Sequence, residues 1–391
     1  MGNFVNLPDK QAAQIQDKIE SYRDSFFHRS SGATLPVINY LGKFEKSPSN
    51  SFTEEFFVSM PIKNQEKIII DILQTLLSNI TQNFTLGLLF DNCSDKSLKV
   101  CKEFFSDSFD KYQNLSTVYF VQSNGELFES TSENILFLLC TQKYFLSIQA
   151  DNFFTDKTFL ERSVKAFSKL PTLFVISGKA VVSFKILSKL RIIANKILHS
   201  YNYFINFGVR NVRKKKLGFY FPTLGYFGDL ANPPNSYMQF STRQLNTLYL
   251  GEAVIRGPVI WLSDIFRKLD GFNDIAFTLG RDDCDLCFRA FLEGYIAGYL
   301  PCRAFSVYEH GTTRKKRSQE DQIQLDNRIA ISKNNPSNLM KFWKGEISPD
   351  LIYKVHRNNV DIKKNYGKSI FLLDKSYFNN FSNFFRLKNF K

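Results

Sequence analysis

The stretch that decides the fold reads Gly-Phe-Asn-Asp at 271–274, followed by Gly-Arg-Asp-Asp-Cys-Asp-Leu at 280–286. From Asp282 onward, apolar residues recur at the helical spacing i, i+3, i+4 and i+7, at Cys284, Cys287, Phe288 and Phe291. A helix that starts at Asp282 therefore has three acids in its first turn. A helix N-terminus stabilises acids, and Asp285 is spaced to pair with Arg289, so capping explains one or two of the three. Crowded carboxylates also repel, which can raise the pKa of one of them toward the range of a general base.

The composition indicates a globular α/β protein with a large core. The chain has 391 residues, 43% of them hydrophobic and 15% aromatic, which excludes a disordered protein and suits one α/β unit or two lobes with extensions. The formal net charge of +14 predicts an anionic partner, such as a nucleotide diphosphate, an acidic lipid surface or nucleic acid. The six cysteines are too sparse for a disulfide scaffold and are expected to be reduced.

Neither a membrane span nor a secretory signal is predicted. No apolar run is long enough to cross a bilayer, and the first residues lack an apolar core, so we expect a cytoplasmic protein. The residues from 363 to 391 are basic and aromatic, and two interpretations of them remain open. They could form an interfacial helix with Phe378, Phe381 and Phe385 on one face, giving a peripheral membrane contact, or pack back on the rest of the chain.

Alternating strand and helix patterns predict the architecture. A helical stretch at 10–27 and a connector rich in Ser, Gly and Pro, through 51, come first. We then expect strands at 55–60, 84–90, 117–122 and 144–148, with helices at 62–80, 97–109 and 126–138 between them. This order predicts a largely parallel sheet with helices on both faces, in which ligands bind beyond the carboxyl ends of the strands.

Two polar clusters follow predicted strands. Asp91 stands with Ser94 and Asp95 after the second strand, and Gln149, Ala150, Asp151 and Asn152 stand together after the fourth. Their positions make them candidate ligand-binding residues. The alternative is that these side chains only form turns or cap the next helix, which is a routine use of Asp and Asn.

Several motifs succeed one another along residues 55 to 315. They are Pro61 with Asn64, Gln65 and Glu66, the run Asp91 to Asp95, the strand end at Asp151, Gly271 with Phe272, the run Asp282 to Arg289, and Pro301 with Glu309 and His310. In order and spacing they resemble the motifs of family 2 glycosyltransferases, which have the GT-A fold. Members of that family use a nucleotide-activated sugar and usually invert its anomeric carbon.

The resemblance implies an α/β protein with a GT-A type, Rossmann-like α/β/α sandwich, a mostly parallel central sheet, and helical N-terminal and C-terminal extensions. The expected divisions are an N-terminal helical extension and linker at 1–50, a GT-A domain at 51–345, and a basic aromatic extension at 346–391. Within the domain, 51–151 is expected to be the nucleotide-sugar-binding half and 152–345 the acceptor half, with an insertion at 178–256.

The resemblance also implies roles for individual residues. Asp91 would contact the nucleotide base, Asp151 would reach a divalent metal on the diphosphate, and Asp283 would be the base that activates the acceptor. His310 resembles a further metal ligand of the family. Mn²⁺ or Mg²⁺ prefers hard oxygen ligands and stabilises a departing diphosphate. A UDP-sugar is the commonest donor in the family. The basic run that begins with Arg314 and Lys315 follows directly, where a mobile loop could close over the diphosphate.

Two departures from the family pattern refine this prediction. Gln149 stands where the family's metal motif usually begins with an acid. The ligand atom at this position would be the neutral amide oxygen of glutamine. No Gln-x-x-Arg-Trp signature of processive synthases follows, which favours transfer of a single sugar to a glycan or other hydroxyl acceptor, in glycan or surface polysaccharide biosynthesis.

Two alternatives from other functional classes remain open. The first is a catalytically silent, GT-A-like carbohydrate-binding or scaffold protein, which the neutral Gln149 motivates. The second is a basic nucleic-acid binder. No nucleic-acid-binding signature is visible, however, and the basic residues occur in separate clusters, so nucleic acid is not an expected partner.

Overall fold

We describe the protein from a computed structural model of the full chain. The structure describes residues 4–5, 9–46, 55–178, 181–183, 248–251, 254, 256–277, 282–300 and 302–307, and the short pieces 319, 322–323, 326, 370–371 and 385–387. All structural statements below concern these residues.

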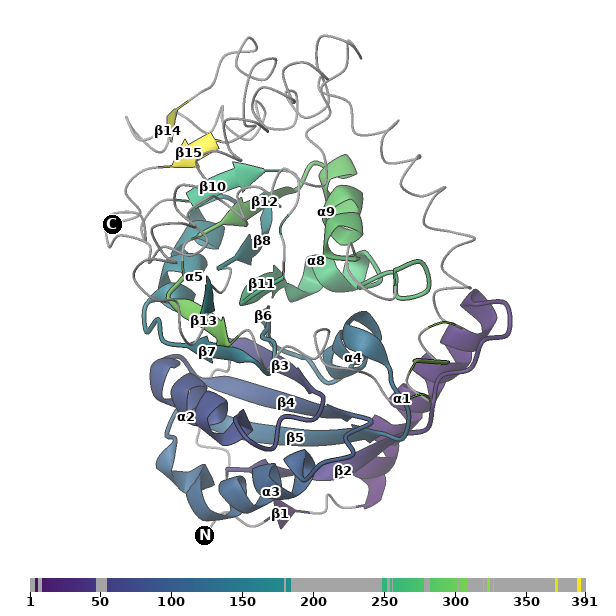
Figure 1. The fold of residues 1–391 in the computed structure, drawn as a ribbon. Coiled ribbons are helices and arrows are strands. Elements are labelled where there is room, and N and C mark those ends of the chain that lie inside the picture. Colours follow the sequence, from purple (N-terminus) through teal and green to yellow (C-terminus); the bar gives the residue numbers. More distant parts are fainter. Residues whose placement is uncertain are drawn as a thin grey trace, which may run out of the picture.

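Four parallel strands form the centre of the main sheet, in the order β5-β4-β3-β6 (Figure 1). They are β3 (Phe56–Ile62), β4 (Phe84–Asp91), β5 (Leu115–Ser123) and β6 (Tyr144–Ser147). Every residue of β4 is buried, as expected for a strand covered on both faces. All four predicted strands are therefore confirmed, to within two residues at each end.

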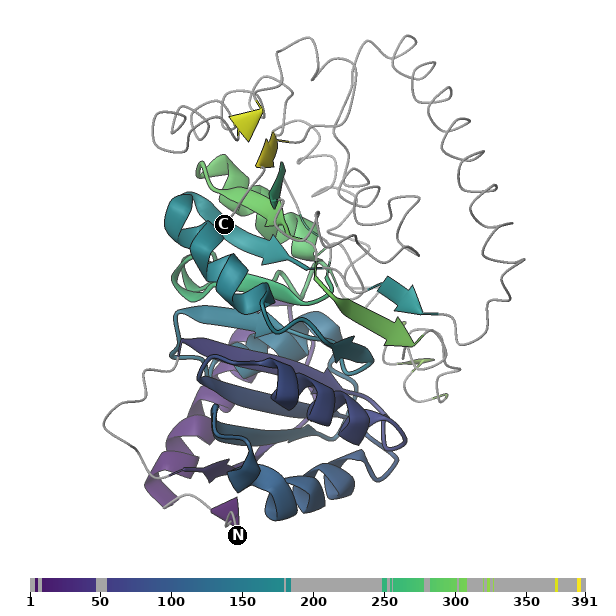
Figure 2. The same ribbon diagram turned by 90° about the vertical axis from the view of Figure 1, so that its left-hand side faces the viewer.

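Helices cover both faces of this parallel centre. α2 (Ile69–Asn79) and α3 (Ser97–Ser108) lie on one face, and α4 (Phe128–Phe137) lies on the other (Figure 2). Right-handed crossovers explain this arrangement, because the chain moves outward from β3 to β5 and then returns past β3 to reach β6. The predicted α/β/α sandwich is confirmed, and the carboxyl ends of its strands meet at one edge of the sheet.

The second half of the chain extends the same sheet with mixed directions. β11 (Val259–Leu262) is antiparallel to both β6 and β8 (Leu173–Ser177), and β12 (Ile296–Tyr299) is parallel to β8. The remaining elements here are α5 (Phe159–Lys169), α8 (Ser263–Lys268) and α9 (Asp282–Leu292), with a small second sheet of β7 (Asn152–Phe154), β13 (Ala304–Val307) and β9 (Val181–Ser183). The start of α9 agrees with the predicted helix at Asp282.

The N-terminal region differs from its prediction. α1 (Asp9–Arg29) is the expected helix, but β2 (Ile38–Glu45) occupies the predicted connector and pairs with β5, while β1 (Phe4–Val5) pairs with β2. The strand was missed because its alternation of apolar residues is interrupted. A register shift lies between Tyr40 and Gly42, and Gly42 has a φ of 125°. The first 46 residues therefore contribute strands to the main sheet.

The described part of the C-terminal extension is also strand rather than helix. β15 (Phe385–Leu387) pairs with β10 (Leu248–Gly251) and with β14 (Ile370–Phe371). The predicted interfacial helix through Phe385 is therefore wrong at that residue. A backbone paired with β10 fits the alternative prediction, in which this segment packs back on the rest of the chain.

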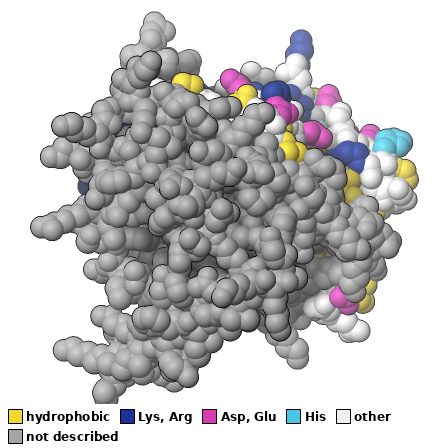
Figure 3. Space-filling view, turned by 90° about the horizontal axis from the view of Figure 1, so that it is seen from above, with side chains coloured by type: hydrophobic (Ala, Val, Ile, Leu, Met, Phe, Trp, Pro, Cys, Tyr) yellow, Lys and Arg dark blue, Asp and Glu magenta, His cyan; other side chains and the backbone are white. Residues whose placement is uncertain are grey.

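Figure 3 shows one face of the molecule, and the described residues occupy only part of it. In the view from above (Figure 3), the described acidic and basic side chains alternate with apolar ones, and no patch of one sign stands out among them. Within the described ranges, no helix combines the length and apolar character that a bilayer crossing requires. The basic runs at 210–216 and 314–317 lie outside the described residues.

Candidate active site

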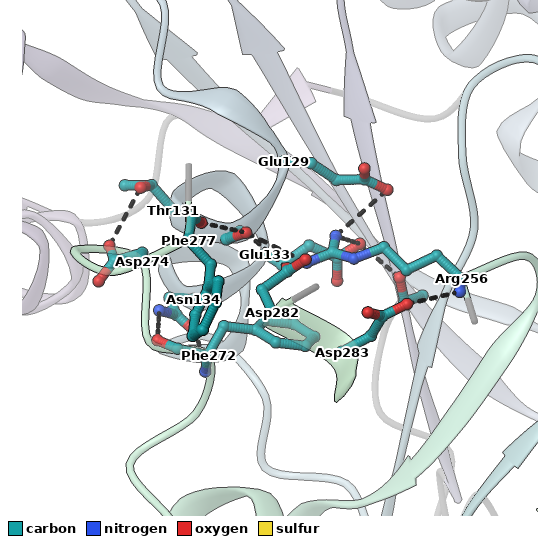
Figure 4. Close-up of polar contacts among 12 residues, drawn as sticks. Glu129, Thr131, Glu133, Asn134, Arg256, Phe272, Asp274, Phe277, Asp282 and Asp283 are labelled. Atoms are coloured by element: carbon teal, nitrogen blue, oxygen red, sulfur yellow. Dashed lines mark hydrogen bonds and ion pairs between the residues drawn. The ribbon is translucent and has the colours of Figure 1, made fainter. Parts of the chain in front are cut away.

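A buried arginine, Arg256, lies at the centre of a cluster of carboxylates (Figure 4). Its side chain is only 8% exposed. One guanidinium nitrogen is in direct contact with Asp282 at the start of α9, and the other lies 3.2 Å from Glu129 and 3.8 Å from Glu133 on α4. The guanidinium also lies over the ring of Phe272, 4.4 Å from its centre. Arg256 therefore ties the N-terminal turns of two helices together.

The carboxylate of Asp283 is held by two backbone groups. Oδ2 accepts a hydrogen bond from the backbone N–H of Arg256 at 3.0 Å, and Oδ1 accepts one from the backbone N–H of Cys284 at 2.8 Å. The residue is 6% exposed. Burial raises the pKa of Asp283 above its ordinary value, while the Arg256 guanidinium and the two N–H groups lower it. Such a carboxylate is fixed in place and has a stronger affinity for a proton than a solvated one.

The other acids of α9 have structural partners. The carboxylate of Asp282 accepts a hydrogen bond from the Ser130 hydroxyl at 2.5 Å in addition to its contact with Arg256. Asp285 pairs with Arg289 at 2.9 Å, as their spacing predicted. The apolar face predicted for this helix is buried, including both Cys284 and Cys287. Of the three crowded acids, Asp283 is the one whose hydrogen bonds, within the described residues, both come from backbone N–H groups.

The side chain of Glu133 is 1% exposed, as deeply buried as that of Asp282. It accepts a hydrogen bond from the Ser147 hydroxyl at the end of β6. Burial raises the pKa of Glu133 to about 7, against the lowering effect of Arg256. Its carboxyl group therefore changes protonation state close to neutral pH.

The Glu133→Gln substitution is expected to flatten the pH dependence of stability. The folded-state pKa of about 7 lies above the ordinary value of 4.5, so the folded state binds the extra proton between these two pH values. Stability then falls as pH rises through this window, by on the order of 3 kcal/mol. Urea unfolding from pH 4.5 to 8 should show the variant gaining stability relative to the parent protein as pH rises. Parallel profiles would contradict this assignment.

The polar cluster after β6 contacts the Arg256 cluster. Gln149 Nε2 donates to Glu129 Oε1 at 2.9 Å, and Gln149 Oε1 accepts from Asn152 Nδ2 at 3.2 Å. The same Asn152 amide donates to Asp151 Oδ1 at 3.1 Å. A continuous series of contacts thus runs from Asp151 and Asn152 through Gln149, Glu129 and Arg256 to Asp283. Residues predicted from distant motifs are brought to one edge of the sheet.

Asp91 caps a helix. Its two carboxylate oxygens accept hydrogen bonds from the backbone N–H groups of Leu127 and Phe128 at 2.7 and 3.2 Å, and the residue is 6% exposed. These contacts hold the N-terminus of α4, which carries Glu129 and Glu133. The capping alternative for Asp91 is therefore observed, whereas contact with a nucleotide base stays a prediction.

Asp95 takes part in the hydrogen bonds that join two loops. Its carboxylate accepts from the backbone N–H groups of Glu66 and Ser97, both at 3.0 Å. In return, Asn64 Oδ1 accepts from the Ser94 backbone at 2.8 Å, and Glu66 accepts from the Lys96 backbone. The loop after β3 and the loop after β4 therefore hold each other, and the motif at 61–66 has a structural role here.

The Gly-Phe-Asn-Asp motif at 271–274 anchors helix α1. Gly271 has a φ of 63°, and a Cβ atom there would meet Asn134 Oδ1 at 2.6 Å, so only glycine fits. The Asn134 amide pairs with the Phe272 backbone in both directions at 2.9 Å. Asp274 is fully buried and accepts hydrogen bonds from the hydroxyls of Tyr22 at 2.6 Å and Thr131 at 3.0 Å. The N-terminal helix is thereby fixed to α4.

Three predicted site residues cannot be placed. His310, Arg314 and Lys315 lie outside the described residues, as does most of the predicted insertion at 178–256. Their predicted roles toward the metal and the diphosphate stay predictions.

Comparison with known proteins identifies the family. The sequence model of Glycosyl transferase family 2 matches residues 57–227, which include the parallel centre of the sheet, Asp91 and Asp151. This segment belongs to glycosyl transferase family 2. Over these residues the predicted family is confirmed. No curated protein matches the chain.

Several solved glycosyltransferase structures are similar to this chain at low identity. TarS 1-349 of S. aureus in complex with UDP-GlcNAc has 12% identity over 72% of this chain and 67% of its own, with a TM-score of 0.41. The mannosyltransferase PcManGT of Pyrobaculum calidifontis, in complex with GDP-Man and Mn²⁺, has 9% identity over 90% and 89%, with a TM-score of 0.42. Because these TM-scores are below 0.5, we base no conclusion on the likenesses.

The family 2 resemblance implies a divalent metal, and the residues after β6 fit one. Mg²⁺ at phosphate sites is usually held by one or two carboxylates plus substrate phosphates. Asp151 is half-buried, and Asn152 Oδ1 beside it is a buried oxygen with no hydrogen-bond partner in the described structure. Nowhere in the described ranges do three His, Cys, Asp or Glu side chains group to hold a metal. In a site of the Mg²⁺ type, substrate phosphates would complete the coordination.

Three residues of the cluster around Asp283 were missed by the sequence prediction, namely Glu129, Glu133 and Arg256. Glu129 and Glu133 are four positions apart on α4, a spacing that places two side chains on one helix face. That pattern is common on solvated helices, so it gave no reason to expect burial. Arg256 was assigned to the end of the insertion, and no local motif marks it.

Proposed function

We propose that the protein transfers a single sugar from a nucleotide-sugar donor to an acceptor hydroxyl, with inversion of the anomeric carbon and with Asp283 as the base. The observation that carries this proposal is the carboxylate of Asp283, which is buried, fixed by two backbone N–H groups, and joined by a series of contacts to the acidic motif at Asp151. Family membership supports glycosyl transfer, and this arrangement of residues supports the direct displacement.

The chemistry follows from the contacts of Asp283. An ionised carboxylate has about four lone-pair sites, and the two backbone N–H groups use two of them, so the acceptor hydroxyl can donate to a remaining one. As the acceptor oxygen bonds to the anomeric carbon, its proton moves to Asp283. The bond from that carbon to the diphosphate breaks, and the electron pair leaves with the nucleotide diphosphate. A single displacement of this kind inverts the anomeric carbon.

We propose Asp151 as the residue that holds a divalent ion, Mn²⁺ or Mg²⁺, against the donor diphosphate, with Asn152 Oδ1 beside it. The ion would neutralise the charge of the departing diphosphate. Asp91 is proposed at the nucleotide base, His310 as a further metal ligand, and Arg314 and Lys315 at the phosphates. A UDP-sugar is the first donor to test, and a glycan hydroxyl is the proposed acceptor.

A thermal-shift screen of nucleotide sugars, with and without Mn²⁺, tests the proposal. A ligand at 100 times its Kd stabilises the folded state by about 2.7 kcal/mol, which raises the Tm by several degrees. We expect one donor class to raise the Tm, and Asp151→Asn to remove the part of the shift that depends on Mn²⁺. If no nucleotide sugar changes the Tm, the silent carbohydrate-binding or scaffold alternative gains support and the proposed function is wrong.

A further inference from the structure

We propose that Glu129 of α4 supplies the second carboxylate of the metal and diphosphate site, in place of the acid that Gln149 has replaced. This inference rests on the proposed function and names a residue of the same site. Glu129 belongs to none of the sequence motifs and lies 20 positions before Gln149 along the chain. The tertiary structure alone brings the two side chains together.

Hydrogen bonds connect Glu129 to Asp151. Gln149 donates to Glu129 Oε1 at 2.9 Å, and the Asn152 amide donates both to Gln149 Oε1 at 3.2 Å and to Asp151 Oδ1 at 3.1 Å. Two side-chain amides therefore lie between two carboxylates. In this arrangement Gln149 orients Glu129 and adds no negative charge of its own.

Exposure distinguishes Glu129 from the other acids around Arg256. Its side chain is 35% exposed, whereas the side chains of Glu133 and Asp282 are each 1% exposed. A carboxylate that solvent reaches is more accessible to a donor diphosphate and its ion than one that is fully buried. Glu129 is the most accessible acid of this cluster.

A second observation points to a cation beside Asp151. Asn152 is 1% exposed, and its Oδ1 atom has no hydrogen-bond partner within the described residues. A desolvated acceptor without a donor is unfavourable, and a metal ion or its bound water would satisfy it. The side-chain amide of Asn152 donates to both Asp151 and Gln149. Its unsatisfied oxygen is therefore part of the pair of amides that links the carboxylates of Asp151 and Glu129.

The charge of the cluster also favours a bound cation. Within the described residues, Glu129, Glu133 and Asp282 contact the guanidinium of Arg256, and Asp283 accepts a hydrogen bond from the backbone N–H of the same residue. Arg256 has its closest contact with Asp282, and it would keep this partner if Glu129 turned to a metal. An acid at position 149 would lie beside Glu129 and repel it, which explains why a neutral amide suits this chain.

Metal affinity measured on a pair of exchanged residues tests the inference. Free Mn²⁺ is followed by electron paramagnetic resonance during titration of the full chain in the presence of UDP and, separately, GDP. We expect Glu129→Gln to weaken Mn²⁺ binding about 10- to 100-fold. The double variant Glu129→Gln with Gln149→Asp exchanges the carboxylate and the amide of this hydrogen-bonded pair, so the carboxylate is carried by residue 149. Most of the affinity for Mn²⁺ should therefore return. Glu103→Gln, on the exposed face of α3, is the matched control.

The outcomes separate this inference from the proposed function. If the parent protein binds Mn²⁺ with neither nucleotide, the proposed function and this inference are both overturned. If the parent binds and Glu129→Gln binds equally well, only the role of Glu129 is wrong. A folded double variant that binds as weakly as Glu129→Gln overturns the inference too, because Glu129 would then act only as a partner of Arg256. Restored Mn²⁺ binding in the double variant supports the proposed role of Glu129, even where the Glu129→Gln variant is unstable.

Discussion

Asp283→Asn is expected to lower kcat for glycosyl transfer about 10²- to 10⁴-fold, the usual contribution of a general base. Asparagine is nearly the same size, but it cannot take a proton from the acceptor hydroxyl. Donor binding should change little, because Asp283 lies at the acceptor side of the proposed reaction. Initial rates with saturating donor, together with donor affinity from calorimetry, measure the two effects separately.

Asp285→Asn is the matched control for this experiment. Asp285 is a buried acid in the same turn of α9, and its partner is Arg289 at 2.9 Å. Both substitutions remove one buried negative charge from the start of the helix, so both should lower the Tm. Only the Asp283 variant should lose transfer at a temperature where both proteins are folded. Undiminished transfer by Asp283→Asn would exclude Asp283 as the base.

Arg256→Met is expected to cost about 3–5 kcal/mol of stability, because removing one partner leaves buried carboxylates uncompensated. In the native protein the guanidinium contacts Asp282, Glu129 and Glu133. The backbone N–H of residue 256 donates to Asp283 whatever the side chain is, so this hydrogen bond remains available. The substitution therefore removes charge from the cluster while the anchor of the proposed base is retained.

The same substitution should move the pH profile of the reaction. Arg256 lowers the pKa of Asp283 against the effect of burial, and Glu129 raises it. Without the guanidinium the pKa of Asp283 rises further, so the base is protonated at higher pH. The acidic limb of kcat against pH should then move to higher pH. Arg256→Lys, which retains the positive charge, should show a smaller shift.

A pH profile measured at a temperature where each variant is folded separates this effect from lost stability. An unchanged acidic limb in Arg256→Met would mean that Asp283 does not titrate in the reaction. A downward shift would contradict the electrostatic role assigned to Arg256.

Local patterns were sufficient to predict most of the described fold. Strands such as β4 consist of continuous apolar residues between turn residues, and α9 has one apolar face, so each reveals its type without its neighbours. β2 was missed because a register shift interrupts its alternation. In the C-terminal extension the structure describes only short strands. One of them, β15, is stabilised by pairing with β10. Such pairing has no local signature.

The sequence by itself determined the parallel strands, the helix that starts at Asp282 and the family motifs that follow one another along the chain. Those features depend on spacing within one segment. The tertiary structure alone decided that Glu129, Glu133 and Arg256 surround the proposed base, that Asp91 caps α4, and that Gln149 faces another acid. The physical reason is that charge compensation and burial depend on distances between segments far apart in the chain, which a helix or strand pattern does not encode.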